Sequence, residues 1–229
     1  MNETVIEQLR REAEAAVKHR LPKETFTDFA HPNNRLLVGV TCLRAGLCDL
    51  AYKLFQTITE EGPKENPNQH FAYVRSLVEM AELDAEAERF GEAAEKMKKA
   101  LNHYPESMGY MMSRVHLEVY LAYYLYQAGE KQEAVGKIAA IVKREREKFA
   151  ALPLHDAVAL VGPGLCYAIH QWALFYAMEE NWEQAARKAA EMVPYAAEVD
   201  QAGIKEAEQL LAGGNAETAF HRTIASITY

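Results

Sequence analysis

The segment from Glu118 to Val142 places the strongest constraint on the fold, because one apolar-periodic stretch stops at Gly129 and a second starts almost at once. Apolar residues recur at helical spacing on both sides of this glycine: Leu121, Tyr124 and Leu125 before it, and Ala134, Ile138 and Ile141 after it. A glycine can take the left-handed conformation that closes a helix. The segment therefore predicts a helical hairpin, and since one hairpin cannot bury both its faces alone, we expect further hairpins along the chain.

The same arrangement recurs along the sequence. A glycine stands five residues before an alanine at three places: Gly46 and Ala51, Gly129 and Ala134, and Gly214 and Ala219. Around Ala93 and Ala185 the glycine is replaced by glutamate, but an aromatic residue, Phe90 or Trp182, stands three residues before the alanine. The five alanines predict five hairpins, separated by 42, 41, 51 and 34 residues.

Residues 32 to 229 resemble the tetratricopeptide repeat, a helical hairpin of about 34 residues that reads W-x2-L-G-x2-Y, then A-x3-F, then P. Ala51-x3-Phe55 followed by Pro63 fits the second half of this pattern, and Ala93-x3-Met97 followed by Pro105 fits it nearly as well. The large and small residues of the first half are matched by four pairs: Val38-Gly39, Met80-Ala81, Leu121-Ala122 and Trp172-Ala173. The resemblance implies an all-α fold, a right-handed α-α superhelix of about five hairpins.

The resemblance also implies a division of the chain. Residues 1–31 would form an N-terminal capping helix with a connector, and residues 32–229 the repeat domain, with units near 32–65, 72–105, 115–148, 166–199 and 200–229. The helix could instead be a dimerisation arm. The longest excess over a regular repeat falls at residues 152–165, where Gly162-Pro163-Gly164 predicts a sharp break. We expect a cap, a lid or a self-association contact there.

Charge, cysteine content and hydrophobicity limit which partners and which cellular compartment we expect. A net charge of −8 argues against nonspecific binding to nucleic acid or to an anionic membrane, since phosphate binding needs a basic surface. Three cysteines without a C-x2-C pair argue against a disulfide framework and favour a reducing compartment. Since no apolar run approaches the roughly 20 residues of a membrane span, we expect a cytoplasmic protein.

In the tetratricopeptide family the first helix of each repeat lines a concave groove that binds a partner's peptide or helix. Carried over to this sequence, the resemblance assigns eleven residues to such a groove: Leu36, Val40, Val78, Glu82, His116, Val119, Tyr123, Tyr126, Tyr167, His170 and Leu174. This lining is apolar and aromatic, and it would suit an apolar segment of a partner. The acidic run after Val78 could instead meet a basic segment. A stripe of Tyr and Leu at helical spacing is also what a buried core looks like, so both interpretations stay open for each residue.

Sites for catalysis have little support in the sequence. The eight histidines form no H-E-x-x-H motif, and no glycine loop with a following lysine could cradle a phosphate. The one acid–base group that the repeat alignment brings together is His116, His170 and Glu82. We therefore predict a non-enzymatic protein-binding module, an adaptor or regulator without metal or cofactor. The alternatives are a self-assembling structural protein, and a small-ligand sensor or enzyme with a pocket around His116 and His170.

Overall fold

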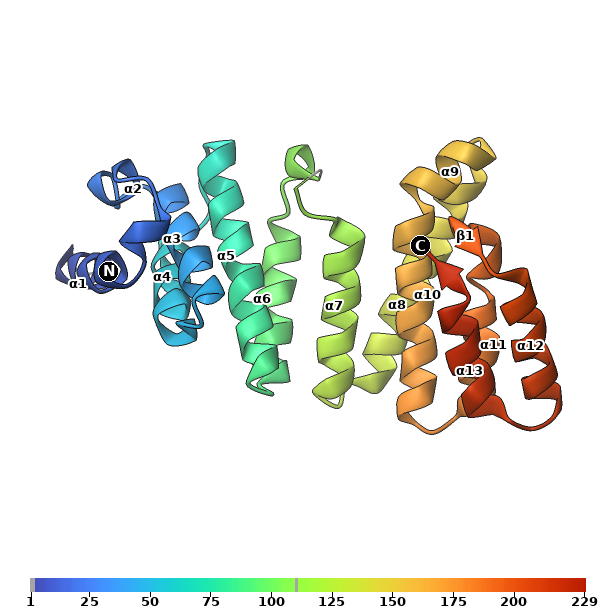
Figure 1. Ribbon diagram of the computed structural model, residues 1–229. Helices are drawn as coiled ribbons and strands as arrows, with labels where there is room; N and C mark the ends of the chain where they lie inside the picture. Colours follow the sequence, from blue (N-terminus) through green and yellow to red (C-terminus); the bar gives the residue numbers. More distant parts are fainter. Residues whose placement is uncertain (1–2, 110) are drawn as a thin grey trace. The chain divides into compact units, whose positions relative to one another are not determined.

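The computed structural model describes residues 3–109 and 111–229, and over these residues the chain is helical apart from two short strands (Figure 1). The chain divides into two compact units, Met1–Leu117 and Glu118–Tyr229. The helix α7 (Arg114–Gln127) begins at the end of the first unit and continues into the second. Of the predicted segment 1–31, residues 1 and 2 lie outside the described part of the chain.

The first unit consists of α-helices joined by short connections. In sequence order each of α3, α4 and α5 packs against the next helix, and α3 also contacts α5. The 3-10 turns of this unit are Lys18–Arg20 and Glu106–Met108. Its helices are α1 (Glu3–Val17), α2 (Glu24–Thr27), α3 (Pro32–Arg44), α4 (Cys48–Glu60), α5 (Pro67–Glu86) and α6 (Phe90–Asn102).

The second unit packs around α10, which contacts α8, α9 and α11, while α13 packs against α11 and α12. A 3-10 turn, Val193–Tyr195, precedes its first strand. Besides α7, its helices are α8 (Lys131–Ala150), α9 (Leu154–Leu160), α10 (Gly162–Met178), α11 (Trp182–Ala190), α12 (Gln201–Ala212) and α13 (Ala216–Ala225). The strands β1 (Glu198–Val199) and β2 (Ile227–Thr228) pair in antiparallel fashion, which the sequence analysis did not anticipate.

In the part of the chain that the structure describes, five pairs of helices are joined by the same type of turn. Five alanines in the sequence predict these hairpins: Ala51, Ala93, Ala134, Ala185 and Ala219. The residue five positions before each of them has a left-handed backbone: Gly46 (φ 76°), Glu88 (58°), Gly129 (93°), Glu180 (57°) and Gly214 (83°). The N–H of the following residue donates to the carbonyl five residues earlier, at 2.8 to 2.9 Å in all five turns. This bond is characteristic of the Schellman motif, which satisfies a helix's last carbonyls. The two glutamates thus take the conformation that glycine takes elsewhere.

Each of these hairpins has a pair of small buried residues twelve positions apart in the sequence, one in each helix. Because neither side chain extends beyond a methyl group, the two helices of a hairpin can approach closely at this point. Both members of the pair are buried in all five hairpins: Gly39 and Ala51, Ala81 and Ala93, Ala122 and Ala134, Ala173 and Ala185, and Ala207 and Ala219.

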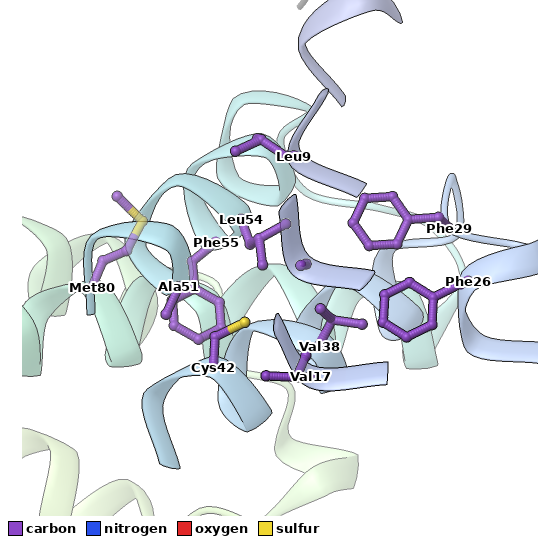
Figure 2. Close-up of a cluster of buried hydrophobic side chains, with 11 residues drawn as sticks. Leu9, Val17, Phe26, Phe29, Val38, Cys42, Ala51, Leu54, Phe55 and Met80 are labelled. Atoms are coloured by element: carbon purple, nitrogen blue, oxygen red, sulfur yellow. The ribbon is translucent and has the colours of Figure 1, made fainter. Parts of the chain in front are cut away.

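The N-terminal helix α1 covers the first hairpin. Its sequence places apolar residues on one side, and the structure buries them against α3 and α4 (Figure 2). The rings of Phe26 and Phe29 stack with centroids 6.2 Å apart and extend this core. The buried cluster consists of Leu9, Ala13, Val17, Phe26, Phe29, Val38, Cys42, Ala51, Leu54, Phe55 and Met80.

The break predicted at Gly162-Pro163-Gly164 lies slightly earlier in the structure. These three residues form the first turn of α10, where a proline is tolerated because its missing N–H would have no helical partner. The chain bends by 59° between α9 and α10. A β-carbon on Gly162 would lie 2.5 Å from the carbonyl oxygen of Tyr195, so this glycine permits a close backbone approach.

Among the described residues, no single helix is long and apolar enough to cross a membrane. Only α9 and α10 taken together reach that length and composition, and they are bent against each other.

Candidate partner-binding face

In the first unit, four of the predicted groove residues lie on α3 and α5, which are in contact. Leu36 and Val40 on α3 are partly exposed, whereas Val78 on α5 is fully buried and offers no surface to a partner. Glu82 is partly exposed. Burial raises the pKa of its carboxyl group, and the charges of Glu79 and Glu86 add to this effect.

His116 belongs to the first unit, whereas His170 belongs to the second, so each is described within its own unit. Both side chains are partly buried, and burial lowers the pKa of both imidazoles below the ordinary value of 6.5. Neutral imidazoles are therefore the prevailing form at pH 7.

Two of the predicted residues on α7 are part of the core of the second unit. Val119 is fully buried. The ring of Tyr126 stacks on Phe175 with centroids 4.2 Å apart, and its hydroxyl donates to the Phe175 carbonyl at 3.1 Å and to the Glu179 carboxylate at 2.6 Å. These contacts give Tyr126 a structural role between α7 and α10.

The remaining predicted residues of the second unit lie on α7 and α10, two helices that are in contact through the rings of Tyr120 and Tyr167. Tyr123 on α7 and Tyr167, His170 and Leu174 on α10 are all partly exposed. Two residues that sequence reasoning missed, Tyr120 and Tyr229, contact members of this set. We call this surface the aromatic face and define it by Tyr120, Tyr123, Tyr167, His170 and Leu174; Tyr229 lies against it, on His170.

Ring contacts hold the aromatic face together. Tyr120 lies edge-on to Tyr167 across the two helices, with centroids 6.2 Å apart, and stacks on Tyr124 at 6.3 Å. Tyr123 is tilted against Tyr124 at 5.9 Å. The rings are thus fixed before any partner arrives, which lowers the entropy cost of binding.

His170 joins the second helix of this face to the last part of the chain. Its Nδ1 lies 2.5 Å from the hydroxyl of Tyr229, and the two rings are nearly perpendicular at 86°. Burial raises the pKa of Tyr229 to about 12. Burial, and then the neighbouring Tyr120, also raises the pKa of Tyr167. The hydroxyls of Tyr167 and Tyr229 and the imidazole of His170 are therefore uncharged at neutral pH.

A shallow cavity of about 360 Å³ opens elsewhere in the second unit. Its mouth carries an ion pair between Lys131 and Glu179, 2.5 Å apart. The lining is mainly aromatic and apolar: Tyr126, Lys131, Gln132, Val135, Trp172, Phe175, Tyr176 and Glu179. The sequence analysis named only Tyr126 of these residues as part of a site.

The described residues contain no group of three or more His, Cys, Asp and Glu side chains placed to hold a metal ion. Cys42 and Cys166 are buried, and burial raises the pKa of their thiols to about 11 and about 12. Such thiols are poor nucleophiles at neutral pH because the thiolate is the reactive form. Cys48 is exposed.

Comparison with known proteins adds no relative to this description: no protein-family model matches the chain, and no curated protein is significantly similar to it.

Proposed function

We propose that this protein is a divergent array of tetratricopeptide-type hairpins that binds another protein and catalyses no reaction of its own. The observation that carries the proposal is the repetition of one turn and one small-residue pair in five hairpins whose sequences otherwise differ. Arrays of hairpins present extended surfaces on their first helices, and such surfaces commonly bind peptides.

The aromatic face is the part of the second unit best suited to this role. It consists of partly exposed Tyr, His and Leu side chains on α7 and α10, which are first helices of their hairpins. Tyrosine is enriched where proteins bind one another because its ring offers a large contact area and freezes few torsions. We infer that the partner contributes an apolar segment to this face.

Affinity purification from the source cells, with the full chain as bait, tests the proposal. We expect one protein to co-purify in stoichiometric amount, and Tyr123→Ala or Leu174→Asp to weaken its binding by about 10- to 100-fold. Lys143→Ala is the matched control, because Lys143 is exposed on α8, outside the aromatic face. Circular dichroism must show that each variant is folded. Retention of the partner at wild-type affinity by both face variants would contradict the proposal.

A second candidate function, self-assembly, is favoured by the exposure of α9. Leu154 and Leu160 are 69% and 75% exposed, far more than most large apolar side chains of the described chain. Exposed apolar patches of this kind mark association surfaces. Light scattering at high concentration would then report an oligomer that Leu154→Asp and Leu160→Asp together convert to a monomer. A wild-type protein that is already monomeric at high concentration would dismiss this function.

A further inference from the structure

Residues 226–229 follow α13 and lie against the segment before α12, with Ile227 and Thr228 forming the strand β2. Two backbone bonds fasten them to the segment before α12: the N–H of Ala197 donates to the Thr228 carbonyl at 3.0 Å, and the N–H of Asp200 donates to the Ser226 carbonyl at 2.8 Å. The pairs are Glu198 with Thr228 and Val199 with Ile227. We call residues Ser226–Tyr229 the strap.

The strap lies close to the first turn of α12 because a glycine there leaves room for it. Gly203 is buried, and a β-carbon there would collide with the Ser226 hydroxyl and lie 2.6 Å from the Asp200 carboxylate. The Ser226 hydroxyl donates to the Arg222 carbonyl at 2.8 Å. Ile227 is buried in the same region. The strap is therefore held along its backbone, and the position of Tyr229 follows from it.

Tyr229 reaches from the strap to α10. Its hydroxyl lies 2.5 Å from Nδ1 of His170, and its ring stands edge-on to the imidazole with centroids 6.1 Å apart. In Figure 1 the label C, beside α10, marks this place. Because both groups are uncharged at neutral pH, a phenol that donates to Nδ1 of an imidazole protonated on Nε2 suits this geometry.

We propose that the strap is an internal occupant of the partner site: Tyr229 fills the place on α10 that a tyrosine on an extended segment of the partner takes when it binds. The proposal rests on the function proposed above and names the chemistry of the partner. The occupant already seated there shows what the site accepts, namely an extended backbone beside β1, an apolar residue, and a phenol aimed at His170. When the partner binds, its segment must therefore displace the strap from this site.

Exchange of this kind has a measurable signature. A tethered segment competes with an incoming peptide at an effective concentration in the millimolar range. A free peptide that copies the strap must therefore bind better when Tyr229 is replaced, because the strap is then held only by its backbone bonds and by Ile227. The contacts that it would form are few, so its own dissociation constant should be on the order of 1 mM.

The experiment uses the full chain and a synthetic peptide, acetyl-Ala-Ser-Ile-Thr-Tyr-amide, which copies residues 225–229. In ¹H–¹⁵N NMR titrations of Tyr229→Ala, we expect the peptide to shift the resonances of residues 166–170 and 197–200. The peptide should bind the wild-type protein with an affinity at least 10-fold lower. The same peptide with Phe or Ala for Tyr should bind Tyr229→Ala at least three-fold more weakly, since it lacks the phenol.

Two results would overturn the proposal: equal binding of the peptide to wild-type protein and Tyr229→Ala, or equal binding of the Tyr and Ala peptides to Tyr229→Ala. If Tyr229→Ala does not fold, Tyr229→Phe serves instead, because it removes only the hydroxyl. The titration needs no natural partner. A site that passes it while no protein co-purifies would thus refute the proposed function alone, and a partner that binds while the titration fails would refute the strap exchange alone.

Discussion

Gly39 in α3 lies directly against the ring of Phe55 in α4. A β-carbon on Gly39 would lie 3.0 Å from Cδ1 and Cζ of Phe55 and still closer to Cε1. Phe55 is fully buried, so its ring has no room to withdraw. We expect Gly39→Ala to destabilise the first unit by about 1 to 3 kcal/mol, the usual cost of overpacking a core, as measured by urea unfolding.

The control for this change is Gly136→Ala. Gly136 lies inside α8, and a β-carbon there would meet no atom within 4 Å. The substitution should stabilise the protein by about 0.5 to 1 kcal/mol, since alanine favours the helix interior. A Gly39→Ala variant as stable as the wild type would show that α3 and α4 can move apart.

Replacing the two left-handed glutamates by glycine should stabilise the protein. Glu88 and Glu180 have exposed side chains and φ angles of 58° and 57°, a conformation that disfavours residues with a β-carbon. We expect about 0.5 to 1 kcal/mol from either Glu88→Gly or Glu180→Gly, after allowing for the greater freedom of glycine in the unfolded chain. Thermal unfolding measures the gain. The reverse change, Gly129→Ala, should cost about 1 kcal/mol, and a loss of stability in the glycine variants would contradict this account.

The buried guanidinium of Arg35 organises the first hairpin. It donates to the Thr57 hydroxyl and the Ala30 carbonyl, both at 3.0 Å, and forms a short ion pair with Glu61. Arg35→Met should destabilise the first unit by about 2 to 4 kcal/mol, because these acceptors lose their donor. Arg44→Met, on the exposed end of the same helix, should change the unfolding free energy by less than about 0.5 kcal/mol. Similar effects of the two changes would rule out a special role for Arg35.

The same ion pair makes stability depend on pH. Burial raises the pKa of Glu61, but hydrogen bonds from Arg35 and Lys64 outweigh it, and the pKa lies below the ordinary value of 4.5. A carboxyl group with a lowered pKa contributes stability above that ordinary value and loses it as the pH falls through the folded-state pKa. Urea unfolding between pH 6 and 3 should therefore show a loss of stability that is smaller in Arg35→Met. An identical pH profile for the two proteins would exclude this pair as the cause.

Tyr126→Phe removes one hydroxyl that bridges α7 and α10. The loss of its bonds to Phe175 and Glu179 should cost about 1 to 2 kcal/mol in urea unfolding. The hydrogen bond from Lys131, and then the one from Tyr126, lower the pKa of Glu179, so this pKa should rise in the variant, as NMR titration can show. Tyr176→Phe, a change on the same α10, is the matched control and should alter neither quantity. An unchanged Glu179 pKa in Tyr126→Phe would contradict the hydrogen bond.

The sequence predicted the turns well because each depends on local interactions. Gly46, Gly129 and Gly214 mark helix ends through their own backbone preference, and the alanines that follow them are buried. Glu88 and Glu180 were located by the same alanine pattern. Their left-handed conformation could not be read from residue type, since the Schellman bond imposes it against the preference of glutamate.

The composition of the aromatic face was only partly predictable. The repeat alignment chose Tyr123, Tyr167 and His170, which lie on α7 and α10 in the structure, but it could not tell the partly exposed Tyr123 from the buried Tyr126, whose ring stacks on Phe175. That distinction depends on contacts about fifty residues apart in the sequence. Tyr229 carried no signal at all, because it follows the last helix and its position depends on the β1–β2 ladder and on the contact with His170.

The order of packing along the chain has a consequence for biosynthesis. In the first unit each of α3, α4 and α5 packs on the next helix, so a growing chain finds partners for each helix soon after it is made. The ladder between Glu198–Val199 and Ile227–Thr228 is different, because its second strand is translated after both helices of the last hairpin. Until then, His170 has no Tyr229 beside it. The aromatic face of a nascent chain is therefore open while the ribosome still holds the strap.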